Sequence, residues 1–154
     1  MAGRAGSDDA NRLKWAIPDP SCGKTGGVSV QLNHTIVHAA DPSASARWLA
    51  DLLGVEASPQ WGPFFPVRVD GTELDYMENR GSFTAQHYAF LVSDDVFDAA
   101  LNRLSEQGAQ IWADPHKQHP GAINHDDGGK GVYFEDKEGH LMELITVPYG
   151  GWPS

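Results

Sequence analysis

The chain repeats one pattern of structure-forming residues, and this repeat most limits the folds open to it. His34 and His87 each stand in an apolar run, 53 positions apart. Gly54 and Gly108, 54 positions apart, each follow apolar residues at helical spacing, where a helix-ending glycine belongs. Repeats of this size indicate two similar units that bury a surface together.

Each unit is predicted to contain a strand, a helix and three further strands, which makes the fold class α+β. Asp41-Pro42 starts the first helix, because Asp caps free N–H groups and Pro needs no partner there. Asp70-Gly71 predicts a hairpin. The strands are expected at residues 28–40, 55–57, 64–69 and 72–77 in the first unit, and at 86–92, 109–112, 131–135 and 140–146 in the second.

The predicted domain organisation has three parts: an N-terminal extension at 1–29, one domain at 30–147 with modules 30–80 and 85–147, and a tail at 148–154. In the extension, Leu13, Trp15 and Ile17 alternate with other residues, which favours an added strand. The small and polar residues around them favour a partly disordered extension instead.

Composition excludes several classes of function. The chain has 154 residues, with 11 Lys+Arg against 21 Asp+Glu and a formal net charge of −10, which disfavours nucleic acid because phosphate binding depends on basic side chains. The single Cys22 excludes a disulfide framework within one chain and a cysteine-based zinc site. No apolar run reaches the ~18 residues of a membrane span, and the first residues lack the apolar core of a signal peptide. A cytoplasmic protein is predicted.

Two histidines and one glutamate occupy matching places on the predicted strands. His34 and His87 lie early in the first strand of each unit, and Glu143 lies in the last strand of the second. Such a set binds a divalent metal on one face and leaves about three positions open for substrate, water or O₂. Alternatively, the histidines are hydrogen-bonded core residues and Glu143 points to solvent. Leu141 and Ile145 share the face of Glu143, which favours an inward carboxylate.

Three segments carry a family resemblance. They are Leu-Asn-His34-Thr-Ile-Val-His-Ala-Ala-Asp, His87-Tyr-Ala-Phe-Leu-Val-Ser, and Gly-Val-Tyr133-Phe-Glu-Asp-Lys-Glu-Gly-His-Leu-Met-Glu143-Leu. Between Leu32 and about Val147 the chain resembles the vicinal oxygen chelate superfamily, which includes glyoxalase I, extradiol dioxygenases, fosfomycin resistance thiol transferases and bleomycin resistance proteins. The last segment is the most specific, with Lys137 where the family usually has Pro.

The resemblance implies two βαβββ modules that form a half-open β-barrel around a metal. His34, His87 and Glu143 match the family's metal-ligand positions, and the bleomycin-binding members lack this set, which favours an enzyme. Asp75 is the repeat equivalent of Glu143, and glyoxalase I has a fourth ligand on that strand. Glu73, on the same face, is a rival for that role. The resemblance also implies a homodimer.

Two further residues are catalytic candidates through the resemblance. Tyr133 lies ten residues before Glu143, a spacing shared with the dioxygenases and thiol transferases, and its hydroxyl would bind a metal-bound oxyanion. His125 precedes that strand, where extradiol dioxygenases have an acid/base histidine. A packed aromatic and an exposed loop histidine are the alternatives. The other histidines are expected to be bystanders: His116 and His119 facing solvent, His38 inside the barrel or at its rim, and His140 structural.

Basic residues are few near the end of the chain, where only Lys130 and Lys137 lie between 124 and 154. This disfavours a phosphonate substrate, and the few Arg and Lys overall disfavour glutathione, although Arg47, Arg68 and Arg80 remain available. The leading function is an extradiol-type dioxygenase using Fe(II) on a small aromatic or vicinal-oxygen substrate. The alternatives are a non-catalytic antibiotic-binding resistance protein and a glyoxalase-type isomerase or lyase. Mn, Ni and Zn are the alternative metals.

Overall fold

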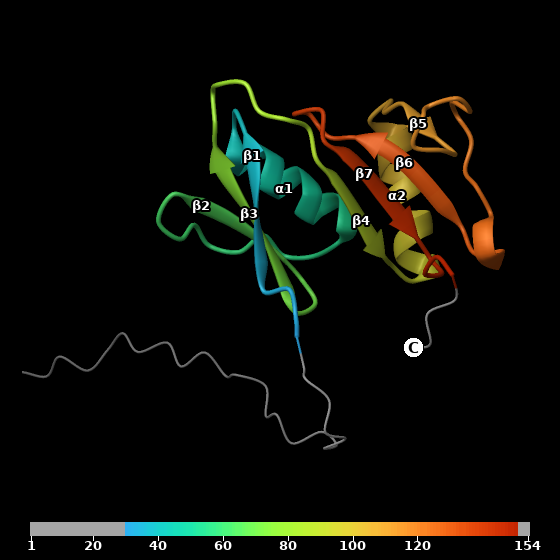
Figure 1. Ribbon diagram of the computed structural model, residues 1–154, viewed down its shortest axis with the longest axis horizontal. Coiled ribbons are helices and arrows are strands. Elements are labelled where there is room, and N and C mark those ends of the chain that lie inside the picture. Colours follow the sequence, from blue (N-terminus) through green and yellow to red (C-terminus); the bar gives the residue numbers. More distant parts are fainter. Residues whose placement is uncertain (1–29, 151–154) are drawn as a thin grey trace, which may run out of the picture. The chain divides into compact units, whose positions relative to one another are not determined.

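The computed structural model describes residues 30–150, of which Gln31 onward belong to one compact unit of the chain (Figure 1). The predicted N-terminal extension and the last four residues lie outside the described residues. No helix within 30–150 is long and apolar enough to cross a membrane.

The first module forms a three-stranded sheet in the order β1-β3-β2. Its elements are β1 (His34–Ala39), α1 (Pro42–Leu53), β2 (Phe64–Val69) and β3 (Thr72–Glu78). β1 pairs with β3 in parallel, and β2 pairs with β3 in antiparallel across the Asp70-Gly71 turn. The predicted helix signals are confirmed: Asp41 Oδ1 accepts from Ala44 N at 3.0 Å, and Gly54 ends α1 with φ 71°.

One predicted strand of this module is wrong. Residues 55–57 form no strand, and only an isolated bridge joins Ala57 to Val67. Pro59 follows closely, and because proline has no N–H it cannot extend the pairing. The first module therefore has three strands instead of four.

The second module contains the full βαβββ order in a four-stranded sheet, β4-β7-β6-β5. Its elements are β4 (His87–Leu91), α2 (Asp94–Glu106), β5 (Ile111–Trp112), β6 (Gly131–Glu135) and β7 (Leu141–Ile145), with a short 3₁₀ turn at Asp126–Gly128. β4 pairs with β7 in parallel, and β6 pairs with β7 in antiparallel. Ser93 caps α2, because its side chain accepts from Val96 N. The structure is thus α+β, with two related modules in two mixed sheets.

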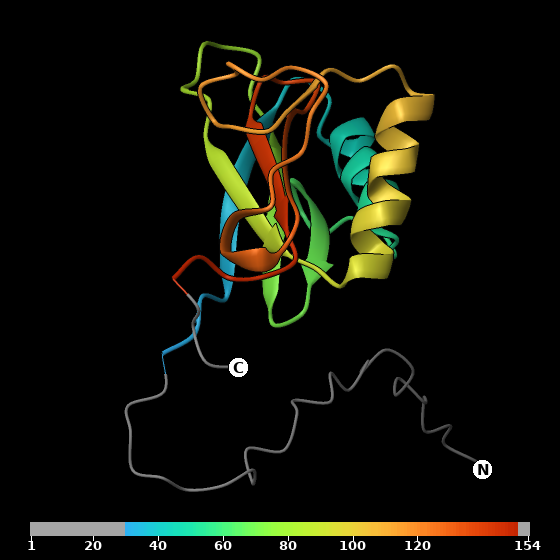
Figure 2. The same ribbon diagram turned by 90° about the vertical axis from the view of Figure 1, so that its right-hand side faces the viewer.

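The two helices lie side by side and join the modules (Figure 2). Arg103 Nη1 donates to the Leu52 carbonyl at 3.1 Å, at the C-terminal end of α1 where carbonyls lack helical partners. His140 makes a second link: its Nε2 donates to the His38 carbonyl at 2.9 Å, and its Nδ1 accepts from Gln86 N at 3.0 Å. Because His140 is 1% exposed and bonded at both nitrogens, its environment matches the structural role expected of it.

Strand alternation gives each sheet two different faces. On one face, side chains such as Val37, Leu74 and Leu144 are buried with the apolar residues of the helices. We call the opposite side the open face. On the first sheet the open face includes His34, Ile36, His38, Glu73, Asp75 and Met77, and on the second sheet it includes His87, Ala89, Leu91, Tyr133 and Glu143.

Candidate functional site

The open face of the second sheet gathers a histidine, a glutamate and a tyrosine from three strands. Tyr133 on β6 and Ala89 on β4 are the cross-strand neighbours of Glu143 on β7. His87 lies two residues before Ala89, so its side chain emerges on the same face. The predicted strand pattern therefore brings His87, Tyr133 and Glu143 together.

Glu143 is a buried carboxylate with two hydrogen-bonding partners. Its side chain is 3% exposed, and His87 Nε2 lies 3.0 Å from Oε2. The Tyr149 hydroxyl donates to Oε1, and the Tyr133 hydroxyl lies 3.0 Å from that of Tyr149. These bonds offset the cost of burying a charge, which a carboxylate without partners would bear in full.

The two phenols keep their protons at neutral pH. Burial is the main cause that raises the pKa of Tyr133, and the neighbouring Glu143 raises it further. Burial and the hydrogen bond to Glu143 likewise raise the pKa of Tyr149. Both hydroxyls are therefore hydrogen-bond donors beside the carboxylate.

Candidate residues of the first sheet lie in a separate group. His34 is exposed, and its Nδ1 lies 2.9 Å from Asn33 Oδ1. Asp75 is 7% exposed, and its pKa is raised chiefly by burial and then by Glu73, while His34 acts to lower it. Glu73, the rival ligand candidate, forms an ion pair with Arg68.

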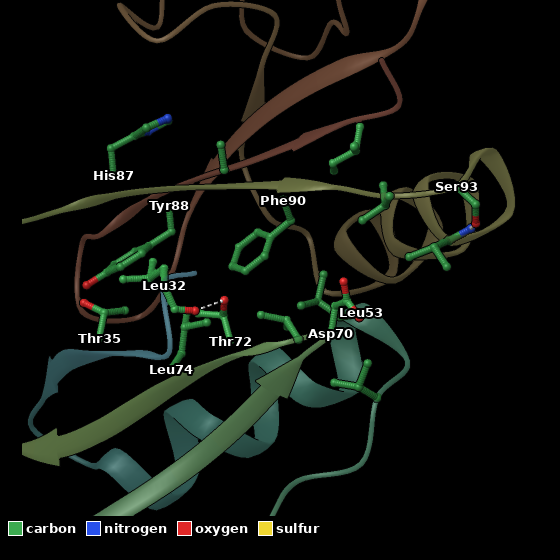
Figure 3. Close-up of a pocket in the computed structure, with 16 residues that line it drawn as sticks. Leu32, Thr35, Leu53, Asp70, Thr72, Leu74, His87, Tyr88, Phe90 and Ser93 are labelled. Atoms are coloured by element: carbon green, nitrogen blue, oxygen red, sulfur yellow. Dashed lines mark hydrogen bonds between the residues drawn. The ribbon is translucent and has the colours of Figure 1, made fainter. Parts of the chain in front are cut away.

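The open faces of the two sheets do not meet within one chain. Tyr88 and Phe90 of β4 point toward Thr35 and Leu74 of the first sheet across a cavity of about 600 Å³, whereas His87 points away from it (Figure 3). Between residues 30 and 150 no group of three or more His, Cys, Asp or Glu side chains is placed to hold a metal ion. The structure thus joins His87 to Glu143 but leaves His34 apart from them.

The His87–Glu143 pair nevertheless suits a divalent metal. Its 3.0 Å separation of Nε2 and Oε2 matches two neighbouring ligands at right angles on an ion with bonds of about 2.1 Å. An imidazole and a carboxylate are two of the three donors of a facial set. The third donor is missing from this group.

His125 lies in the loop before β6, and its ring bonds the backbone of that loop. His125 Nδ1 donates to the Gly129 carbonyl at 3.1 Å. Within the described residues, no hydrogen bond joins His125 to Glu143, His87 or Tyr133. Its predicted acid/base role stays a prediction.

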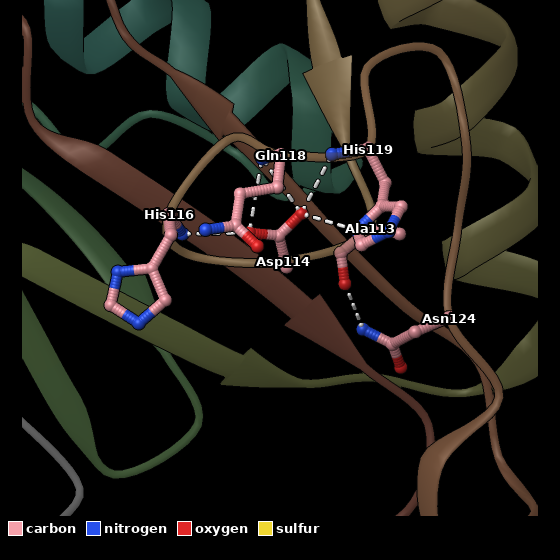
Figure 4. A network of polar contacts seen from close by, with 6 residues as sticks. All are labelled: Ala113, Asp114, His116, Gln118, His119 and Asn124. Carbon is pink, nitrogen blue, oxygen red and sulfur yellow. Dashed lines mark hydrogen bonds and ion pairs between the residues drawn. The ribbon is translucent and has the colours of Figure 1, made fainter.

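The other loop histidines belong to a separate polar network around Asp114 (Figure 4). The Asp114 carboxylate accepts from the backbone N–H groups of His116, Gln118 and His119, and the His119 ring binds it at 3.0 Å. The His119 side chain is 69% exposed, in agreement with the expectation that it faces solvent. His38, in contrast, has a buried Nδ1 without a hydrogen-bond partner in the described part of the chain.

Sequence reasoning missed Tyr149, which follows β7 and binds the carboxylate directly. No spacing or periodicity marks it, because it lies beyond the last repeated strand. Only its position six residues after Glu143 connects the two in the sequence.

Comparisons with known proteins identify relatives of the chain. The chain is similar to the oxidase ChaP-H2, with 57% identity and a TM-score of 0.79, over 82% of this chain and 100% of that one. It is 30% identical to the glutathione transferase FosA of Serratia marcescens over 73% of this chain and 78% of that protein. It is 36% identical to the metallothiol transferase FosB of Shouchella clausii over 48% of this chain and 45% of that protein.

These relatives are named as enzymes, and one name specifies a metal-dependent reaction. The model of the Glyoxalase/Bleomycin resistance protein/Dioxygenase superfamily matches residues 31–144. The predicted resemblance is confirmed, and the chain belongs to the glyoxalase/bleomycin resistance/dioxygenase superfamily.

Proposed function

We propose that this protein is a metal-dependent oxygen-using enzyme, of the extradiol dioxygenase type, that acts on a small aromatic substrate with adjacent oxygens. The observation that carries the proposal is the buried Glu143 carboxylate paired with His87 beside the phenols of Tyr133 and Tyr149. The 57% identity to a protein named as an oxidase favours oxygen chemistry over thiol transfer.

The proposed metal site is shared between two copies of the chain. His87 and Glu143 lie on one open face, and His34 and Asp75 lie on the other, so one chain does not close the ligand set. In a homodimer, the first sheet of one copy would cover the second sheet of the other and complete a half-open barrel. His34 of the partner subunit would then be the third ligand, and the partner subunit's Asp75 would lie nearest to a fourth position.

His87 and Glu143, with His34 of the partner subunit, would hold a divalent metal, with Fe(II) as the leading choice, which would supply Lewis-acid and oxygen chemistry to a substrate with adjacent oxygens. The chain's own groups would handle protons and orientation. His125 donates through Nδ1 to Gly129, which leaves Nε2 as the acceptor for a substrate hydroxyl proton. The Tyr133 and Tyr149 hydroxyls hold the Glu143 carboxylate in place.

Charge and exposed side chains support a neutral, apolar substrate. Lys130, one of the few basic groups near the end of the chain, forms ion pairs with Asp94 and Asp98. It is therefore engaged and not free to bind a phosphonate. Leu91, on the same open face as His87, is 60% exposed and offers apolar surface to an aromatic ring.

The test is anaerobic reconstitution of the full chain with Fe(II), followed by oxygen-uptake measurements with a panel of catechols. We expect uptake with at least one catechol, and its loss in Glu143→Gln. His116→Ala, in the Asp114 loop, is the control and should retain the uptake. Absence of uptake with every catechol would exclude the dioxygenase. A purified protein without bound metal, unchanged in ligand binding by His34→Ala, would favour a non-catalytic binding protein.

A further inference from the structure

The segment that follows β7 contacts the proposed metal ligand directly. The Tyr149 hydroxyl donates a hydrogen bond to Glu143 Oε1, while His87 Nε2 lies 3.0 Å from Oε2. The next residue, Gly150, donates its N–H to Asp127 Oδ2 at 3.3 Å. The two oxygens of one carboxylate thus have different partners, one on the strand β4 and one on the C-terminal segment.

The C-terminal segment is fixed along its length to the loop before β6. Thr146 N donates to the Lys130 carbonyl at 3.0 Å, and Lys130 N donates to Thr146 Oγ1 at 3.0 Å. A Cβ added to Gly129 would lie 2.9 Å from the Val147 side chain, so a glycine is needed for this close approach. These contacts bring Tyr149 back over the end of β7.

The direction of the hydrogen bonds follows from the donors present. The Tyr149 hydroxyl has a single hydrogen, which it directs to Oε1 of Glu143 in a hydrogen bond. The Tyr149 oxygen then accepts from the Tyr133 hydroxyl, 3.0 Å away. Tyr133 thus bonds the same hydroxyl that binds the carboxylate, and Glu143 also acts on Tyr133 directly by raising its pKa.

We propose that Tyr149 is a positioning residue that occupies Oε1 of Glu143, so that this carboxylate binds metal through Oε2 alone. A carboxylate bound through one oxygen leaves one more coordination position open than a carboxylate bound through both. In the proposed enzyme, that position would be open to the substrate. This inference rests on the proposed function, because it requires a metal at Glu143.

The test measures metal binding and the metal's spectrum in the full chain, with Co(II) alone as the probe. Outer partners of metal ligands typically contribute 10–100-fold in affinity. We expect Tyr149→Phe to weaken Co(II) binding roughly tenfold and to change the visible absorption of the bound Co(II). Tyr133→Phe should have a smaller effect, because Tyr149 keeps its own hydrogen bond to Oε1 in that variant. Tyr88→Phe is the matched control, since the Tyr88 hydroxyl bonds the Ile36 carbonyl instead.

A chain truncated before Tyr149 is the second variant, in case the point substitution disturbs folding, and it should lose affinity to the same extent. Wild-type affinity and spectrum in both Tyr149 variants would overturn the inference. Failure of the wild-type chain to bind Co(II), or equal binding by Glu143→Gln, would overturn the proposed function as well. The two failures are therefore distinguishable.

Discussion

Asp75 and Glu143 occupy repeat-equivalent places on the open faces of the two sheets, but their surroundings differ. Glu143 is bonded by His87 on one oxygen and by Tyr149 on the other. Asp75 is also buried, yet no hydrogen bond to its carboxylate is present within residues 30–150, and burial raises its pKa. The repeat therefore reproduces strand positions, whereas the neighbouring side chains give the two carboxylates different hydrogen-bond surroundings.

The largest expected difference between the two carboxylates is in metal affinity. Glu143→Gln should weaken Co(II) binding by more than about 100-fold, because it removes a ligand and not merely an outer partner. Asp75→Asn should weaken it by less than about tenfold. Equilibrium titration of both variants measures this. An equal loss of Co(II) affinity in the two variants would show that Asp75 is as important a ligand as Glu143, and would contradict the difference between the two carboxylates.

A second difference should appear in stability against pH, measured by thermal unfolding of metal-free protein. Burial raises the pKa of Asp75, so folding favours its protonated form and stability falls as pH rises from about 4, the ordinary value, through the raised pKa. Asp75→Asn should therefore be more stable than wild type at pH 7, with the gap closing below about pH 4. A variant less stable than wild type at pH 7 would contradict this explanation.

We expect a smaller pH dependence of stability, of opposite sign, at Asp114. Within the described residues, the carboxylate of Asp114, unlike that of Asp75, accepts hydrogen bonds from nearby N–H groups. Burial acts to raise the pKa of Asp114, but hydrogen bonds from Gln118, His119 and His116 lower it overall. Because its pKa is lowered, ionised Asp114 stabilises the folded state above about pH 4. This stabilisation is lost as pH falls through the lowered pKa. Hydrogen-exchange protection of the Gln118 and His119 amides should decline in that range, while Leu144 in the core stays protected. If the hydrogen-exchange protection of these two amides did not change at low pH, the hydrogen bonds to Asp114 would not be the cause of its lowered pKa.

Much of the fold is predictable from local signals. The Asp41-Pro42 helix start, the Gly54 helix end and the Asp70-Gly71 hairpin each depend on one or two residues, and all three are present. Residues 55–57 show the limit of this approach. Their apolar character suits a strand, but Pro59 soon ends the pairing, so a single bridge remains.

The site is predictable only where strand alternation decides it. Period two places His87, Tyr133 and Glu143 on one face of one sheet, because their strands are neighbours. The same rule fixes the face of His34 but not which sheet it will meet, since that depends on packing between modules or between copies. Tyr149 lies after the last strand, where no periodicity applies.

Mixed dimers test most directly whether the proposed metal site is shared between two copies of the chain. His34→Ala and Glu143→Gln should each lose metal binding as separate homodimers. When the two variants are unfolded and refolded together, a heterodimer would contain one site with both substitutions and one site with neither. We predict about one tightly bound Co(II) per heterodimer. A heterodimer that binds no more Co(II) than either parent homodimer would show that the two ligands act within one chain, and would contradict a site shared between two copies.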